Sequence, residues 1–254
     1  MGPDLAFALE LADLADSLSL PRFRAADLRV ERKPDLSPVT DADRAVERAL
    51  RERLAAERPG EAVLGEEEGG GEAGDAAARW VLDPIDGTRN FTRGIPVWAS
   101  LIALERDGML VCGVVSAPAL GYRWWAARGE GAHASRLGGA GSAPEPLRVS
   151  GVVELADAAV SCAHAKDLAR LEPGVWHARG VGDFWQNALV AEGALDAAVD
   201  ARLELWDYAP LVPLLEEAGG RITALDGGPP RPGEQVVCSN GLLHDEVLAA
   251  LTGT

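Results

Sequence analysis

The segment 80–91, WVLDPIDGTRNF, holds the residue types and spacing best suited to chemistry. Two carboxylates, Asp83 and Asp86, are followed at once by Gly87 and Thr88. Carboxylate and carbonyl oxygens suit a hard divalent cation, and exposed backbone N–H groups in a turn suit a phosphate. The alternative is a plain Asp-Gly turn without a function, because such turns are common. The segment therefore predicts either a shared cation and phosphate site or an ordinary turn.

A short strand should present these carboxylates. Residues 80–82 are apolar, and Pro84 cannot donate a hydrogen bond to a β-ladder. We therefore expect the chain to leave the sheet at Asp83 and to display both acids at the strand end.

A second acidic cluster, GEEE at 65–68, follows another short apolar run. Three adjacent acids usually form a solvated loop. However, neighbouring strands of one sheet would bring their ends together, so Glu66 could share a site with Asp83 and Asp86. A further acid, Asp207, stands at a predicted helix start, where a purely structural N-cap is the alternative.

Apolar spacing and turn residues predict the elements that must position these groups. Thr40 should cap a helix that runs through Leu54, with Asp43 three residues on as its partner. Helices are also expected at 4–24, 184–192, 206–218 and 242–251. Strands are expected at 61–65, 79–82, 97–105, 109–116, 123–127, 158–162, 194–199 and 221–225, with an Asp107-Gly108 hairpin turn.

The order of these elements changes along the chain. The first half reads as helices on a largely antiparallel sheet, and the second half alternates short strands with helices. We therefore predict an α+β domain at 1–145 and an α/β domain at 146–254. Gly-rich residues 69–78 are predicted to form a loop, and residues 138–146 a linker.

Composition limits the partners. The 254 residues include 40 Asp+Glu and 24 Lys+Arg, for a net charge of −16, which argues against nucleic acid or an anionic membrane as a partner. No apolar run reaches the length of a membrane span, and the amino terminus lacks a basic, then apolar, leader, so a cytoplasmic protein is expected. The cysteines are odd in number and widely spaced, which predicts three core thiols, Cys112, Cys162 and Cys238.

Three motifs in a fixed order carry a family resemblance. GEE at 65–67, DPIDGTRNF at 83–91 and WDYAPLVPLLEEAGG at 206–220 resemble the inositol monophosphatase family of magnesium-dependent, lithium-sensitive phosphomonoesterases. SPVTDAD at 37–43 also fits, so the resemblance covers essentially the whole chain. It implies a layered α/β/α/β/α sandwich and a homodimer. A haloacid-dehalogenase phosphatase is disfavoured because a single residue separates the two aspartates of its motif, whereas two residues, Pro84 and Ile85, separate Asp83 from Asp86 here.

The resemblance also implies the ligands of two to three Mg²⁺ ions. Glu66, Asp83 and the carbonyl of Ile85 would hold one ion. Asp83, Asp86 and Asp207 would hold a second, and Glu66 would help to place a third, weaker one.

The same resemblance implies how catalysis would proceed. Thr88, with Asp43 behind it, would orient and activate a water molecule for in-line attack on phosphorus. The backbone N–H groups of Gly87 and Thr88 would receive the phosphate.

The resemblance implies a small phosphate monoester as the substrate, and the organic half of that ester is the open question. GDFW at 182–185, with residues 37–47 and PVWA at 96–99, resembles the histidinol-phosphatase branch. Asp183 would then bind the cationic half of histidinol phosphate, unless it is only a helix N-cap. Asp200 matches a substrate-hydroxyl ligand of the inositol branch and is a second candidate. An inositol-1-phosphate or broader sugar-phosphate phosphatase remains open, as does a silent metal-binding scaffold, which the complete acidic set disfavours.

Overall fold

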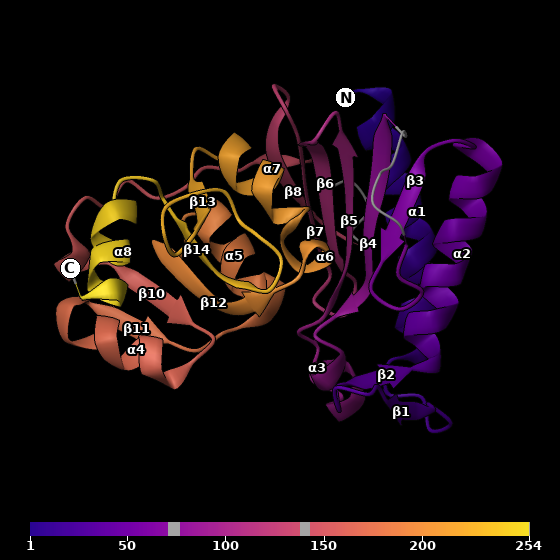
Figure 1. Cartoon of the computed structure of the whole chain (residues 1–254), viewed down its shortest axis with the longest axis horizontal. Helices are drawn as coiled ribbons and strands as arrows, with labels where there is room; N and C mark the ends of the chain where they lie inside the picture. Colours follow the sequence, from indigo (N-terminus) through magenta and orange to yellow (C-terminus); the bar gives the residue numbers. More distant parts are fainter. Residues whose placement is uncertain (71–76, 138–142, 254) are drawn as a thin grey trace.

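Helices and sheets alternate in five layers in the computed structural model, which describes residues 1–70, 77–137 and 143–253 (Figure 1). Two helices cover one sheet, a second group of helices separates it from another sheet, and two helices close the far side. The predicted α+β sandwich is confirmed. Most of the predicted 69–78 loop and 138–146 linker lies outside the described residues.

The first helical layer consists of α1 (Pro3–Ser19) and α2 (Asp41–Glu57). Their apolar faces and one face of the first sheet bury a common core that includes Leu11, Leu50 and Trp80. α2 begins as predicted, because Thr40 and Asp43 form a capping box. The helix predicted at 4–24 instead ends at Ser19 and passes into a 3₁₀ turn that contains Pro21.

The first sheet has seven strands among the described residues, in sequence order. They are β3 (Ala62–Gly65), β4 (Ala78–Asp86), β5 (Ala99–Arg106), β6 (Met109–Ala117), β7 (Tyr122–Ala127), β8 (Gly131–Arg136) and β9 (Glu145–Pro146). β3 and β4 are parallel, and the remaining pairs are antiparallel. Asp107 and Gly108 both have positive φ in the turn between β5 and β6, which confirms the predicted hairpin.

β4 departs from the prediction at its functional end. The strand does not stop at Asp83 but continues to Asp86, with an irregularity in its pairing to β5 between those two residues. Pro84 lies within the irregular stretch, where no ladder hydrogen bond from its nitrogen is required. The carbonyl of Pro84 accepts a hydrogen bond from Ser100 Oγ at 2.7 Å, which secures the bulge on β5.

The second sheet has the order β11-β10-β12-β14-β13. Its strands are β10 (Ala159–Cys162), β11 (His177–Arg179), β12 (Ala197–Leu203), β13 (Arg221–Ala224) and β14 (Glu234–Ser239). Between the sheets lie α5 (Asp183–Ala191), α6 (Leu205–Tyr208) and α7 (Leu211–Glu217), and outside lie α4 (Ala165–Leu171) and α8 (His244–Thr252). The single helix predicted at 206–218 is therefore two helices, separated at Ala209-Pro210.

The remaining elements are a small hairpin of β1 (Val30–Arg32) and β2 (Pro38–Thr40), and the short helix α3 (Thr88–Arg93). Further 3₁₀ turns lie at Leu155–Asp157 and Glu172–Gly174. In the described parts of the chain, no helix combines the length and apolar character needed to cross a membrane.

The two halves of the chain share a core. One buried cluster joins Leu101 and Trp124 of the first sheet to Phe184 of α5 and Leu211 of α7. The division at 145/146 falls inside β9, which pairs with β8, and stays a prediction. The three cysteines are free and buried, as expected.

Candidate active site

Asp83, Asp86 and Asp207 come together although they lie far apart in the sequence. One carboxylate oxygen from each lies within 4.8 Å of the others. Two of the acids come from the irregular end of β4 and the third from α6. Three oxygen ligands this close match the oxygen-rich coordination that a hard divalent cation requires.

Local hydrogen bonds fix the two carboxylates of β4. Asp83 Oδ1 accepts from the backbone N–H of Ile85 at 2.9 Å, and Asp86 Oδ2 accepts from that of Phe184 at 2.8 Å. The second contact ties the DPIDGT segment directly to the start of α5. The bulge thus points both acids toward the second half of the chain.

Asp207 is held by a capping box at the start of α6. Its Oδ2 accepts from the backbone N–H of Glu204 at 2.7 Å, and Glu204 is the N-cap. The alternative that Asp207 is itself the N-cap is therefore wrong, because it lies three residues inside the motif. One of its oxygens stays within reach of the other two acids.

Burial and mutual repulsion make this cluster costly without a cation. Burial, and next the charge of Glu66, raise the pKa of Asp83 well above its ordinary value, and burial and Asp183 do the same for Asp86. Burial raises the pKa of Asp207 to about 7. A divalent cation would offset the repulsion, so these oxygen donors fit Mg²⁺.

Glu66 lies beside this group but outside the three-carboxylate cluster. The parallel register of β3 and β4 pairs Gly65 with Leu82, which brings the GEE turn next to Asp83, as expected from neighbouring strand ends. The carboxylate of Glu66 contacts Lys33 Nζ at 2.7 Å, and the same ammonium lies 2.7 Å from Glu67. Lys33 follows β1, and the sequence argument did not single it out.

Thr88 and Asp43 meet across the site. Thr88 Oγ1 lies 3.3 Å from Asp43 Oδ1 and 3.0 Å from the carbonyl oxygen of Ile85. Asp43 is fully buried, and burial raises its pKa to about 6 although Thr40 donates hydrogen bonds to it. Asp43, the partner of Thr40 in the capping box of α2, is thus also the neighbour of the predicted catalytic hydroxyl.

Gly87 makes the turn into α3 with φ of +79°. A Cβ there would lie 2.9 Å from the carbonyl oxygen of Val97, so both the conformation and the space require glycine. Gly87 is the N-cap of α3 and Thr88 its first residue. The first N–H groups of a helix have no acceptor within the helix, which suits an anion.

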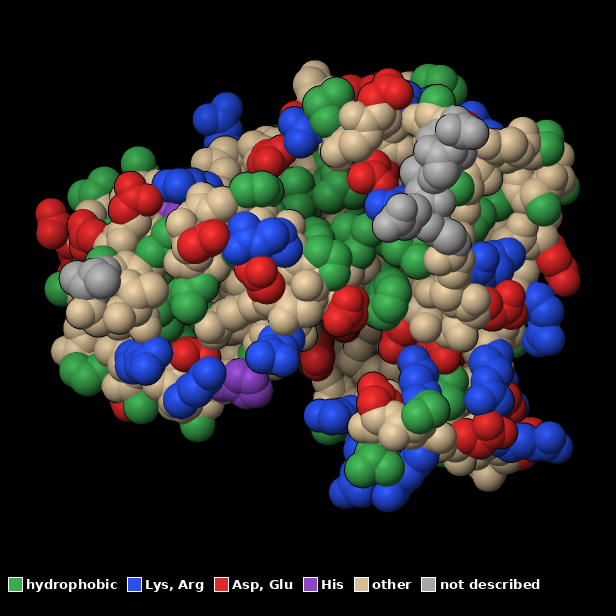
Figure 2. Space-filling view, viewed as in Figure 1, with side chains coloured by type: hydrophobic (Ala, Val, Ile, Leu, Met, Phe, Trp, Pro, Cys, Tyr) green, Lys and Arg blue, Asp and Glu red, His purple; other side chains and the backbone are tan. Residues whose placement is uncertain are grey.

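A cavity of about 230 Å³ adjoins the carboxylate cluster. It is lined by Asp86 and Asp207 together with the two predicted substrate residues, Asp183 and Asp200. Figure 2 shows this face of the molecule hollowed between the two halves, with acidic side chains beside the hollow. The structure therefore brings two of the predicted metal ligands, Asp86 and Asp207, to one cavity with both predicted substrate acids.

Asp183 is not the N-cap of α5. That position belongs to Gly182, and Asp183 Oδ2 accepts from Asn90 Nδ2 at 2.7 Å. Asp183 has φ of +48°, a conformation that costs a non-glycine residue energy and is often retained for function. Burial raises its pKa, while Asn90 and Arg89 act in the opposite direction.

Asp200 lies on β12 and is buried. Its two oxygens accept from the side-chain amides of Gln186 and Asn187 on α5. Burial raises the pKa of Asp200 to about 7. The sequence did not indicate a role for these amides or for Lys33 and Asn90, because it does not show which residue a polar side chain will contact in the folded protein.

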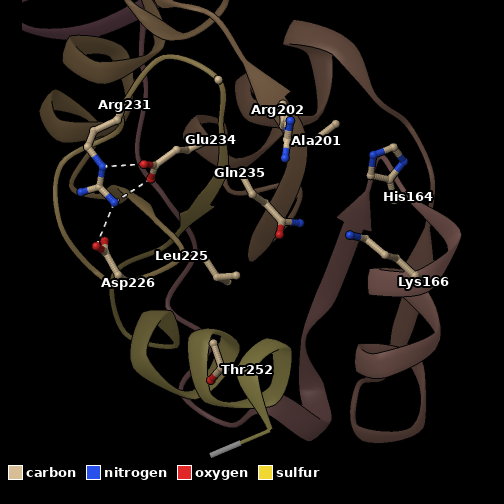
Figure 3. A pocket seen from close by; sticks show the side chains of 11 residues that line it. His164, Lys166, Ala201, Arg202, Leu225, Asp226, Arg231, Glu234, Gln235 and Thr252 are labelled. Carbon is tan, nitrogen blue, oxygen red and sulfur yellow. Dashed lines mark hydrogen bonds and ion pairs between the residues drawn. The ribbon is translucent and has the colours of Figure 1, made fainter.

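A larger cavity of about 750 Å³ lies on the second half, over β12, β14 and α8. Arg231 on one wall pairs with Glu234 and Asp226, and His164, Lys166 and Arg202 are exposed on the others (Figure 3). No lining side chain is buried, and no carboxylate cluster is present. The chemistry therefore favours the smaller cavity.

Comparisons with known proteins agree with this arrangement. The model of the inositol monophosphatase family matches residues 3–253. Histidinol-phosphatase of Mycobacterium tuberculosis is 52% identical over 98% of this chain and 97% of its own, and inositol-1-monophosphatase of Mesorhizobium japonicum is 34% identical over 92% and 90%. The solved Thermotoga maritima IMPase has a TM-score of 0.87 and 28% identity over 99% of this chain and 98% of its own. The chain belongs to the inositol monophosphatase family.

Proposed function

We propose that this protein is a Mg²⁺-dependent phosphomonoesterase that hydrolyses L-histidinol phosphate to L-histidinol and phosphate. The observation that carries the proposal is the cavity in which Asp86 and Asp207 face the same space as Asp183 and Asp200. One side offers ligands for a cation and phosphate, and the other offers acids for a cationic organic group. The 52% identity with a histidinol-phosphatase supports the same substrate.

The metal ligands proposed are those named from the sequence. Asp83, Asp86 and Asp207 would hold one Mg²⁺, and Glu66, Asp83 and the Ile85 carbonyl another, for two to three ions in all. Bound there, Mg²⁺ would lower the pKa of a water ligand and neutralise charge on the phosphoryl group. Lys33 contacts only Oε1 of Glu66, so the other oxygen of this carboxylate would take part in binding the ion.

Thr88 would orient the attacking water. Its hydroxyl proton points to Asp43 or the carbonyl of Ile85, so an oxygen lone pair is free to accept a hydrogen bond from water. Asp43 would keep that hydroxyl oriented. The N–H groups of Gly87 and Thr88 would receive the phosphate oxygens and align phosphorus for in-line attack.

Substrate choice is assigned to Asp183, with Asp200 as the second candidate. Histidinol carries an ammonium and an imidazole, and an acid hydrogen-bonds strongly to such donors. Inositol offers only hydroxyl groups. An inositol-1-phosphate or sugar-phosphate phosphatase is the second candidate function, because a relative named inositol-1-monophosphatase is 34% identical.

The same proposal places the enzyme in histidine biosynthesis, in the cytoplasm and as a homodimer, as the family resemblance implies. A silent scaffold is disfavoured because the chain keeps every residue of the predicted metal and water-positioning set.

Metal removal and one substitution test the proposal. Chelation with EDTA should abolish phosphate release from histidinol phosphate, and Mg²⁺ should restore it. Asp86→Asn should reduce turnover by more than about 100-fold. Mutation of a residue that only hydrogen-bonds to a metal ligand already lowers metal affinity or activity by about 10- to 100-fold. Circular dichroism serves as the control for folding. Full activity in EDTA, or in a folded Asp86→Asn variant, would contradict the metal assignment.

A further inference from the structure

We propose that Glu47 is a positioning residue that holds the acidic turn at 65–68 and thereby sets the metal affinity of Glu66. The inference rests on the metal centre proposed above. Glu47 lies on α2 and is fully buried. It is the last residue of the 37–47 stretch, but it is not among the residues to which the sequence assigned a role in the site.

The carboxylate of Glu47 accepts hydrogen bonds directly from the backbone N–H groups of the turn. Its Oε2 accepts from the N–H of Glu67 at 2.8 Å, and its Oε1 accepts from the N–H of Glu68 at 3.0 Å. Both oxygens are therefore occupied by the two residues that follow Glu66. Because a carboxylate has only acceptors, no other side chain of the same length can satisfy both N–H groups.

Arg51 completes the arrangement from the next turn of α2. Its Nε donates to Glu47 Oε1 at 2.9 Å, which balances the charge of a buried carboxylate, and its Nη2 donates to the carbonyl of Gly69. The pair thus contacts the turn at its N–H groups and at a carbonyl beyond them. A buried charge left without such a partner would be strongly unfavourable.

Gly65 shows how closely the turn approaches Glu47. A Cβ at this position would lie 2.2 Å from Glu47 Oε1, a distance that no side chain could adopt without displacing the carboxylate. The glycine of the GEE motif therefore allows β3 to end directly against α2.

One face of α2 organises both acidic motifs. Asp43 and Glu47 are four residues apart, so their side chains lie on the same side of the helix. Asp43 contacts Thr88 of the DPIDGT segment, and Glu47 holds the GEE turn. α2 would thus fix Glu66 relative to Asp83, beyond what the pairing of β3 with β4 provides.

Manganese binding to the full-length protein tests this inference without reference to activity. Mn²⁺ is titrated into metal-free protein, and the unbound ion is measured by its electron paramagnetic resonance signal. Glu47→Gln keeps the size of the side chain but turns one acceptor into a donor. We expect it to weaken Mn²⁺ binding roughly 10- to 100-fold. Glu52→Gln, an exposed change on the same helix, should bind as the wild type does.

A second variant guards against a simple folding defect. Gly65→Ala leaves Glu47 intact but displaces its carboxylate, and it should weaken Mn²⁺ binding in the same direction. Circular dichroism should show native helix content in both variants. Wild-type affinity in folded Glu47→Gln would overturn the inference and leave the metal centre standing. A wild-type protein that binds no Mn²⁺ would contradict the metal centre itself.

Discussion

Asp183 is the residue on which the proposed substrate choice depends most. Its backbone has a positive φ, its side chain accepts a hydrogen bond from Asn90, and it lines the same cavity as Asp86 and Asp207. The cost of φ at +48° is tolerated where the surrounding structure holds the residue in place, and Asn90 supplies one such contact. Asp183 therefore links the DPIDGTRN segment to the substrate side of the cavity.

Replacing Asp183 by Asn should separate a cationic substrate from a neutral one. Asp183→Asn removes the charge and keeps the shape, so kcat/KM for histidinol phosphate should fall about 10- to 100-fold, the worth of a hydrogen bond to a charged group. The value for p-nitrophenyl phosphate, which has no cationic half, should change much less. Steady-state phosphate release measures both. An equal loss for both esters would assign Asp183 a structural role instead.

At the scale of elements, the bulge of β4 and the left-handed turn at Gly87 carry the site. The bulge points Asp83 and Asp86 to the same side, and Gly87 then turns the chain sharply into α3. The positions of the Thr88 and Asn90 side chains, which follow Gly87 on α3, depend on this turn.

Gly87→Ala should therefore cost both stability and activity. The new Cβ would meet the carbonyl of Val97 at 2.9 Å in a conformation that alanine disfavours, so a loss of about 2–4 kcal/mol in the free energy of unfolding is expected. Gly108→Ala is the matched control, since φ is +76° there and nothing lies within 4 Å. It should lose only about 1–2 kcal/mol. Urea unfolding of the two variants tests the difference, and equal losses would contradict the close approach at Gly87.

The sequence predicted elements well where the local signal decides the structure. The capping box of Thr40 and the Asp107-Gly108 turn are local and were found. The continuation of β4 through Pro84 and the break at Pro210 were not, because each depends on what the bulge or the helix end packs against. The association of Asp207 with Asp83 and Asp86 was anticipated only through the family resemblance.

At the scale of the whole molecule, the charge of −16 has a structural counterpart in buried acids. Asp43, Asp83, Asp86, Asp200 and Asp207 all have raised pKa values, each chiefly through burial. Folding therefore disfavours their charged forms. The contribution to stability is complete below an unfolded-state pKa of about 4 and is lost as pH rises through the folded-state values.

Metal-free protein should accordingly become less stable between pH 5 and pH 8. The pKa values of about 6 for Asp43 and about 7 for Asp200 and Asp207 place most of the loss in this window. Mg²⁺ binds deprotonated carboxylates, so it should raise the Tm more at pH 8 than at pH 5. Calorimetry with K⁺ at equal ionic strength is the control. A metal-free Tm that rises across this range, or a Mg²⁺ effect larger at pH 5, would contradict the burial of these charges.

The central claim joins metal chemistry to a cationic substrate in one cavity. It is tested most directly by kcat/KM for L-histidinol phosphate and for inositol 1-phosphate, measured as phosphate release at one fixed Mg²⁺ concentration. The account predicts a higher value for histidinol phosphate, because Asp183 can bind its ammonium or imidazole but gains no charge interaction with inositol. An equal or higher value for inositol 1-phosphate would contradict it.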